Sequence, residues 1–159
     1  MTTTDPSTST PEARLEELGL TVPDVAAPVA AYVPAVRTGQ YVCTSGQLPV
    51  QNGQPIHTGK VGAEVTLEQA QTAARQCTLN ALAAIGSLTG DLSAITRIVK
   101  VTGFVASAPD FTSQPQVVNG ASELLGEVFG DVGVHARSAV GVAVLPLDVP
   151  VEVEMIVEV

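Results

Sequence analysis

Residues 134–159 read VHARSAVGVAVLPLDVPVEVEMIVEV and contain two strand patterns separated by a turn. In the first, small residues alternate with a mostly valine set, and strict alternation places the two sets on opposite faces. The small set starts with a guanidinium: Arg137, Ala139, Gly141 and Ala143. We expect the valine face to pack on helices and the small face to lie open. Such a surface leaves room for a compact anion held at two points by Arg137.

The second strand pattern alternates apolar residues with Glu152, Glu154 and Glu158. Glu152 is a candidate general acid or base, although two neighbours on its face also fit a solvated surface. If the two strands formed a simple hairpin, Arg137 and Glu152 would lie about 17 to 20 Å apart. A site that uses both would then lie between subunits, or the strands do not pair in this way.

Composition predicts one globular domain with an aliphatic core, because 45% of the 159 residues are hydrophobic and only 3% are aromatic. A net charge of −9 with scattered Lys and Arg makes nucleic acid an unlikely partner. The two histidines have no neighbours at ligand spacing, so we expect no metal, and no cofactor motif is present. Without a signal-like start or a membrane-spanning apolar run, we expect a soluble, cytoplasmic protein.

The chain divides into a disordered tail (residues 1–9), an extension with a short helix (10–27) and a domain (28–159). Thr10-Pro11 resembles a helix start, and Gly19 a stop. In the domain we expect a strand pair over residues 36–48, a turn at Asn52-Gly53 and a strand over residues 95–106.

Two longer helices are predicted between these strands. The first follows a capping box at Thr66 and ends near Gly90; the second follows a capping box at Ser113 and ends near Gly130. The order of elements predicts an α+β fold, a mixed sheet with two helices on one face. The uncovered face indicates a homo-oligomer.

With these motifs in order, the chain resembles the Rid family, also called the YjgF or reactive intermediate deaminase family. The similar segments are Tyr32, residues 44–49 (TSGQLP), 59–62 (GKVG), Asn80, 99–102 (VKVT), Asn119, 136–138 (ARS) and Leu145-Pro146. Ala139 and Gly141 depart from the best-known members, which indicates a divergent branch. The resemblance implies a chorismate-mutase-like fold and a homotrimer with sites at the subunit interfaces.

The resemblance also implies a function and a set of site residues. Arg137 would hold the carboxylate of a 2-imino or 2-enamino acid while water adds and ammonia leaves, without a cofactor. Tyr32, the backbone at Gly46, Asn119 and Glu152 would line the pocket, with Glu152 activating or orienting the water. The residues alone leave open that Tyr32 packs on the surface and that Gly46 is a plain bulge. The alternatives are a non-catalytic trimeric module that binds small carboxylates and, third, a ribonuclease.

Overall fold

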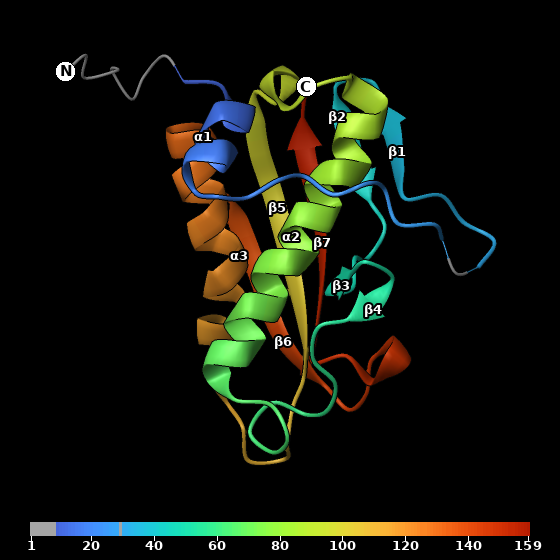
Figure 1. Ribbon diagram of the computed structural model, residues 1–159, viewed down its shortest axis with the longest axis vertical. Helices are drawn as coiled ribbons and strands as arrows, with labels where there is room; N and C mark the ends of the chain where they lie inside the picture. Colours follow the sequence, from blue (N-terminus) through green and yellow to red (C-terminus); the bar gives the residue numbers. More distant parts are fainter. Residues whose placement is uncertain (1–8, 29) are drawn as a thin grey trace.

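The computed structural model describes residues 9–28 and 30–159, so the predicted disordered tail lies, apart from Ser9, outside the described residues. A five-stranded sheet is covered on one face by the helices α2 (Leu67–Thr89) and α3 (Gln114–Phe129), which run diagonally across it in Figure 1. The predicted α+β architecture, one mixed sheet with two helices on one face, is confirmed.

The sheet has the strand order β1-β2-β7-β5-β6. Neighbouring strands are antiparallel except for β5 and β6, which are parallel. A separate hairpin turns at Asn52 and Gly53, both with positive φ, as predicted. The strand bounds are β1 (Ala35–Thr38), β2 (Tyr41–Thr44), β3 (Val50–Gln51), β4 (Gln54–Pro55), β5 (Arg97–Ala106), β6 (Ala136–Val142) and β7 (Val151–Glu158).

Capping and glycine signals set the ends of the long helices. Before α2, Thr66 Oγ1 accepts a hydrogen bond from Gln69 N (3.2 Å) and Thr66 N donates to Gln69 Oε1 (2.9 Å), which confirms the first capping box. The second capping box is wrong, because Ser113 makes no side-chain capping bond. Its ψ of 34° departs from the extended conformation typical of a capping residue. The helices end at Gly90 and Gly130, as predicted.

The predicted short helix is confirmed as α1 (Pro11–Glu17), capped by Thr10. Its Leu15 is only 2% exposed and belongs to the hydrophobic core. Its Glu12 accepts a hydrogen bond at Oε1 from the backbone N–H of Leu92 (2.7 Å), at the start of the short helix η1 (Leu92–Ala94). The helix therefore packs on α3 and η1. The domain boundary placed at residue 28 stays a prediction.

Strands β6 and β7 do not form a hairpin, because β5 lies between them. Val101 of β5 is in register with Arg137 on one side and with Met155 on the other, and residues in register share a face. Met155 and Val101 are buried beneath the helices, so Arg137 also points to the helix-covered face. The expectation that the Arg137 set lies on the open face is therefore wrong. The open face of β6 carries Ser138, Val140 and Val142 instead.

Small residues mark the covered face because α3 approaches the sheet closely. A Cβ at Gly103 would lie 2.4 Å from Val118 Cγ2 of α3. Ala139, in register with Gly103, packs against the core, and a Cβ at Gly141 would lie 2.9 Å from Gln114 Nε2. Valines in these positions would push α3 away from the sheet. The predicted alternation along β6 is correct, but its two faces are reversed.

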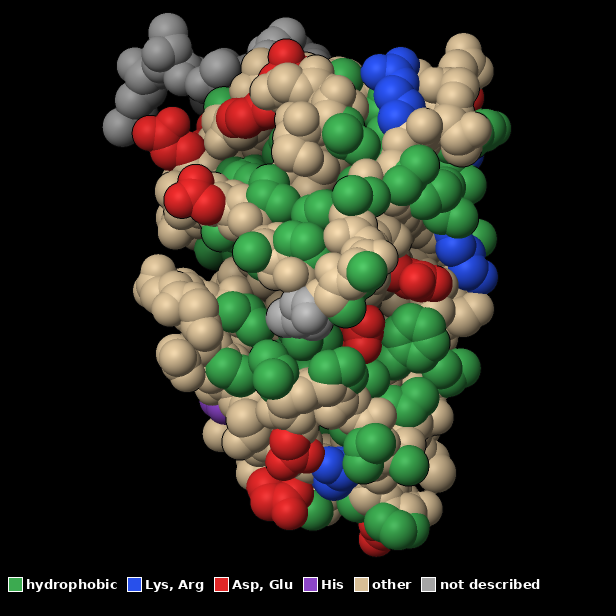
Figure 2. All heavy atoms as spheres, turned by 90° about the vertical axis from the view of Figure 1, so that its right-hand side faces the viewer, with side chains coloured by type: hydrophobic (Ala, Val, Ile, Leu, Met, Phe, Trp, Pro, Cys, Tyr) green, Lys and Arg blue, Asp and Glu red, His purple; other side chains and the backbone are tan. Residues whose placement is uncertain are grey.

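The side of the molecule formed by β1 and the β3–β4 hairpin carries its Lys and Arg side chains in separate places, with acidic groups between them (Figure 2). This distribution agrees with the scattered basic residues of the sequence. None of the helices in residues 9–28 and 30–159 is long and apolar enough to cross a lipid bilayer.

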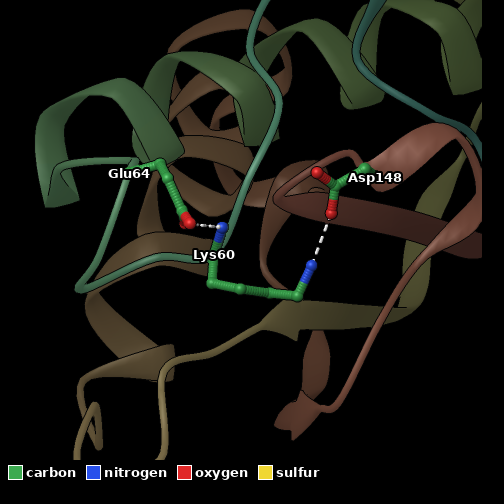
Figure 3. Close-up of polar contacts among 3 residues, drawn as sticks. All are labelled: Lys60, Glu64 and Asp148. Carbon is green, nitrogen blue, oxygen red and sulfur yellow. Dashed lines mark hydrogen bonds and ion pairs between the residues drawn. The ribbon is translucent and has the colours of Figure 1, made fainter.

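A polar clasp ties the loop before α2 to the connection between β6 and β7 (Figure 3). Lys60 Nζ forms an ion pair with Asp148, the Lys60 backbone N–H donates to Glu64 Oε2 (2.8 Å), and Gly59 N donates to Asp148 O (2.8 Å). Leu147 and Asp148 both have positive φ, which costs free energy in side-chain-bearing residues. The clasp thus holds a strained turn in η3 (Pro146–Asp148).

We expect Gly120→Ala to destabilise the fold, because a Cβ at Gly120 would lie 2.2 Å from Gln71 O of α2. Separating α2 from α3 by this overlap should lower the free energy of unfolding by roughly 1 to 3 kcal/mol. Gly126→Ala, also in α3 but with nothing within 4 Å of the new Cβ, is the matched control. It should be neutral or stabilise by up to about 1 kcal/mol through helix propensity. Urea denaturation of both variants measures the difference, and equal effects would contradict this packing.

Candidate functional site

Arg137 and Asn119 lie together between β6 and α3. Arg137 Nη1 donates to Asn119 Oδ1 (2.8 Å) and to Ser122 Oγ (3.1 Å), while Nη2 donates to Pro115 O (3.3 Å). Parallel pairing of β6 with β5 sets this arrangement, because the chain must cross back through α3 before it starts β6. The guanidinium therefore reaches the α3 turns that follow Pro115.

The partners of Arg137 are an amide, a hydroxyl and a carbonyl, all uncharged. No carboxylate among the described residues forms an ion pair with Arg137. A guanidinium is always charged and offers five N–H donors. The side chain is thus fixed in orientation by neutral acceptors while its charge remains available to an anion.

A hollow of about 330 Å³ lies next to the guanidinium, with apolar walls and three polar side chains. Two of these side chains, Ser122 and His135, were not predicted as site residues. A signal for each is present in the sequence, because Ser122 follows Asn119 by three residues on a helix and His135 precedes Arg137 by two on an extended segment. The lining consists of Ser122, Gly126, Gly133, Val134, His135 and Arg137.

Glu152 lies on the open face of the sheet, opposite to Arg137. It is in register with Phe104, three residues along β5 from Val101, which is the neighbour of Arg137. Two strand spacings and three residues separate the Cα atoms of Arg137 and Glu152 by about 14 Å. This separation replaces the one of about 17 to 20 Å expected for a hairpin. The sheet lies between the two side chains.

Gly46 lies directly against Glu152. A Cβ at position 46 would lie 1.8 Å from Glu152 Oε1, so only glycine leaves room for the carboxyl group. Gln47 fixes the approach through two backbone bonds with Val153, of 2.8 and 3.0 Å. From α2, Asn80 Nδ2 supports the same segment by donating to Leu48 O (2.8 Å). Gly46 is therefore a site of close approach rather than a plain bulge.

Burial raises the pKa of the Glu152 carboxyl group, and the nearby negative charge of Glu154 raises it further. Both effects disfavour the carboxylate form, so Glu152 holds a proton more tightly than an ordinary glutamate. A carboxylate in these surroundings is a stronger base than one in water.

Tyr32 is 45% exposed in the segment before β1. Ser45 joins this segment to the Gly46 region, since its Oγ donates to Val33 O (2.6 Å) and its N donates to Pro34 O (2.8 Å). The chain therefore holds the five predicted site residues in two groups. The Arg137 half-site comprises Arg137 and Asn119, and the Glu152 half-site comprises Glu152, Gly46 and the segment with Tyr32.

A metal centre is not built into either half-site. Among residues 9–28 and 30–159, no three His, Cys, Asp or Glu side chains gather closely enough to hold a metal ion. The chemistry available is that of one guanidinium, neutral hydrogen-bonding groups and one carboxyl group with a raised pKa.

Comparison with known proteins gives consistent results across the length of the chain. The family model described as "YjgF/chorismate mutase-like, putative endoribonuclease" matches residues 12–159. Protein TCP17 of Trypanosoma cruzi is 46% identical over 147 residues, covering 92% of each chain. The 2-iminobutanoate/2-iminopropanoate deaminase of Escherichia coli K12 is 37% identical over 133 residues, covering 82% of this chain and 88% of the relative.

Solved structures agree with the fold described above. Protein Atu1372 of Agrobacterium tumefaciens, whose function is unknown, superposes with a TM-score of 0.87 at 46% identity, covering 94% of this chain and 92% of that one. E. coli TdcF with bound serine gives a TM-score of 0.63 at 28% identity, covering 85% and 93%. By its sequence, fold and arrangement of motifs, the chain belongs to the YjgF family, also called the Rid family.

Proposed function

We propose that this protein hydrolyses small 2-imino and 2-enamino acids to 2-oxo acids and ammonia. The observation that carries the proposal is Arg137, whose guanidinium is oriented by Asn119, Ser122 and Pro115 without being neutralised by them. Two relatives support the choice of ligand. One is named for the deamination of 2-iminobutanoate, and another holds serine, which like the proposed substrates has a carboxylate beside a nitrogen-bearing carbon.

The complete site forms between subunits of a homotrimer in this proposal. Arg137 and Glu152 point away from opposite faces of one sheet, so a small molecule cannot contact both in one chain. In a cyclic trimer each subunit presents one half-site to each neighbour. Three equivalent sites result, each with an Arg137 half-site from one subunit and a Glu152 half-site from the next. We also propose a cytoplasmic location, as expected from the sequence.

The reaction requires that the substrate is held in position and that one group accepts a proton from water. Arg137 holds the substrate carboxylate, and the Glu152 carboxylate takes a proton from water as the water oxygen bonds to the imine carbon. The electron pair of the C=N bond moves to nitrogen, which is protonated. The amino nitrogen of the resulting carbinolamine takes up a second proton, balanced by the one that the hydroxyl group loses. The C–N bond then breaks with release of ammonia as the C=O bond forms. An enamine first becomes an imine by taking a proton at carbon and losing one from nitrogen. No electron acceptor or donor is consumed, so the reaction calls for no redox cofactor.

Arg137→Ala should lower kcat/KM for ammonia release by about 10²-fold or more, because it removes charge-assisted hydrogen bonds of about 1.5 kcal/mol or more each. The assay supplies 2-iminobutyrate from an upstream enzyme and follows ammonia. Arg37→Ala is the control for loss of one positive charge, because Arg37 is exposed on β1 and its Nε donates to Gly39 O. Wild-type rates in the Arg137 variant would refute the role.

Calorimetry with 2-oxobutyrate separates the enzyme from the module that binds without turnover. The enzyme should bind this product and accelerate ammonia release. Binding that depends on Arg137, without any acceleration of hydrolysis, would favour the binding module.

Mixed trimers should show whether each site is shared between subunits. Arg137→Ala and Glu152→Gln should each be nearly inactive alone. After unfolding and refolding of an equal mixture, about a quarter of the sites combine an intact Arg137 with an intact Glu152 from different chains. Activity should therefore return to about a quarter of the wild-type value per site. A mixture no more active than the separate variants would contradict the shared site.

The activity should fall as the pH drops through the pKa of Glu152, because only the carboxylate accepts a proton from water. This pKa is raised by burial and by Glu154, so the acidic limb should lie at a higher pH than for an ordinary carboxyl group. Glu154→Gln removes one cause and should move the limb to lower pH. Glu158→Gln, four residues further along β7 from Glu154, should leave it in place. An unmoved limb in the Glu154 variant would argue against Glu152 as the proton acceptor.

A further inference from the structure

A hydrogen-bond chain leads away from Arg137 on the side of the hollow. Ser122 Oγ lies 3.1 Å from Arg137 Nη1 and 2.9 Å from His135 Nε2, and His135 Nδ1 lies 2.6 Å from Gly133 O. All four members of the chain line the hollow of about 330 Å³: Ser122, Gly133, His135 and Arg137. The reaction described above uses neither Ser122 nor His135.

The Gly133 carbonyl group determines which nitrogen of the neutral His135 imidazole carries the proton. Gly133 O can only accept, so His135 Nδ1 must carry the proton. His135 Nε2 is then an acceptor, and the Ser122 hydroxyl donates to it. The Ser122 oxygen accepts at the same time from Arg137. In this state the one donor of Ser122 is directed at the imidazole and is not available to a ligand.

Protonation of His135 changes the direction of this chain. Nε2 becomes a donor to Ser122 Oγ, which then accepts hydrogen bonds from both His135 and Arg137. The Ser122 hydroxyl group, which keeps its proton, can then turn and donate a hydrogen bond into the hollow. The imidazolium and the guanidinium both bond to one oxygen, so they lie within about 6 Å and repel each other. An anion in the hollow relieves this repulsion and accepts the hydrogen bond of the Ser122 hydroxyl group. Both effects favour an anion when His135 is charged.

We propose that Ser122 and His135 extend the anion site of Arg137, and that this site takes up a proton, on His135, when a small carboxylate binds. The proposal rests on the role of Arg137 in the proposed function. The ligand class is a compact monocarboxylate with a second acceptor atom, such as a 2-oxo or 2-imino acid. Its carboxylate bonds to the guanidinium, and its second acceptor receives the Ser122 hydroxyl.

Among the described residues of one chain, no other charged group beside the hollow competes for this proton. Glu152 of the neighbouring subunit, which the proposed function places at the same site, is controlled for by the variants below. No carboxylate in the described part of the chain forms an ion pair with His135, and none lines the hollow. On α3, Glu127 pairs with Arg75 of α2 at 2.8 Å, and Glu123 is exposed. Asp131, in the short helix η2 (Gly130–Gly133), lines a different hollow beside α1. Lys100 of β5 bonds to Ser138 on the opposite face of the sheet.

The test is calorimetry of 2-oxobutyrate binding to the full-length protein at pH 8.0 and 5.5. The ligand stays a monoanion in this range, so any change in affinity comes from the protein. We expect the dissociation constant of the wild type to fall by about tenfold at the lower pH, with uptake of up to about half a proton on binding at the pH values in between. Titrations in two buffers of different ionisation enthalpy measure the uptake.

Three variants identify the group that takes up the proton. Glu152→Gln, which removes the titration of the neighbouring half-site, should still bind more tightly at pH 5.5, whereas the double variant His135→Gln, Glu152→Gln should change by less than about twofold. His57→Gln should keep the wild-type dependence on pH. If the dependence survives in the double variant, or disappears in Glu152→Gln, this inference is overturned while the role of Arg137 stands. If the wild type binds no 2-oxobutyrate at either pH, the proposed function fails and the inference fails with it.

An NMR titration of the imidazoles tests the same claim without a mutation. Adding 2-oxobutyrate should move the titration midpoint of His135 to higher pH and leave that of His57 unchanged. At high pH, the ¹⁵N shifts should report the proton of His135 on Nδ1, because Gly133 O requires it there. A proton on Nε2, or a His135 midpoint that ignores the ligand, would overturn the inference.

Discussion

The pairing of β5 with one parallel and one antiparallel neighbour decides where every candidate side chain points. Parallel pairing with β6 requires the chain to cross back through α3, and this puts α3 above the face that carries Arg137. Antiparallel pairing with β7 buries its valines beneath α2 and turns Glu152 to the other face. The two half-sites thus belong to opposite sides of one sheet, and no side-chain rearrangement can bring them together within a chain.

The electrostatic surroundings of the half-sites differ in the way their proposed roles need. Arg137 is held by an amide, a hydroxyl and a carbonyl, which fix the guanidinium without cancelling its charge. An ion pair in the same place would compete with any anionic ligand. Glu152 is partly removed from water and close to Glu154, so its charged form is disfavoured, and this raises its pKa and its strength as a base.

Close packing by small residues makes the Arg137 half-site possible. Gly103 and Ala139 let α3 lie directly on the sheet, and Gly120 lets it lie against the backbone of α2 at Gln71. At this separation the α3 side chains of Asn119 and Ser122 come within hydrogen-bonding distance of a residue on β6. Larger residues in the interface would move the helix outward and break these bonds. The shortage of aromatic residues in the sequence fits a core built in this way.

Local patterns in the sequence determined the elements. The capping box at Thr66, the stop at Gly90 and the alternation in β7 rest on neighbouring residues, so they could be predicted. The family motifs singled out Arg137 and Asn119 as site residues, and the structure places these two in contact. Only the tertiary structure decided that β5 separates β6 from β7, that the small-residue face of β6 is the covered one, and that Ser122 and His135 join Arg137. Alternation defines two faces of a strand but not which of them meets a helix, because strand pairing joins residues far apart in the chain and depends on the packing of the whole domain.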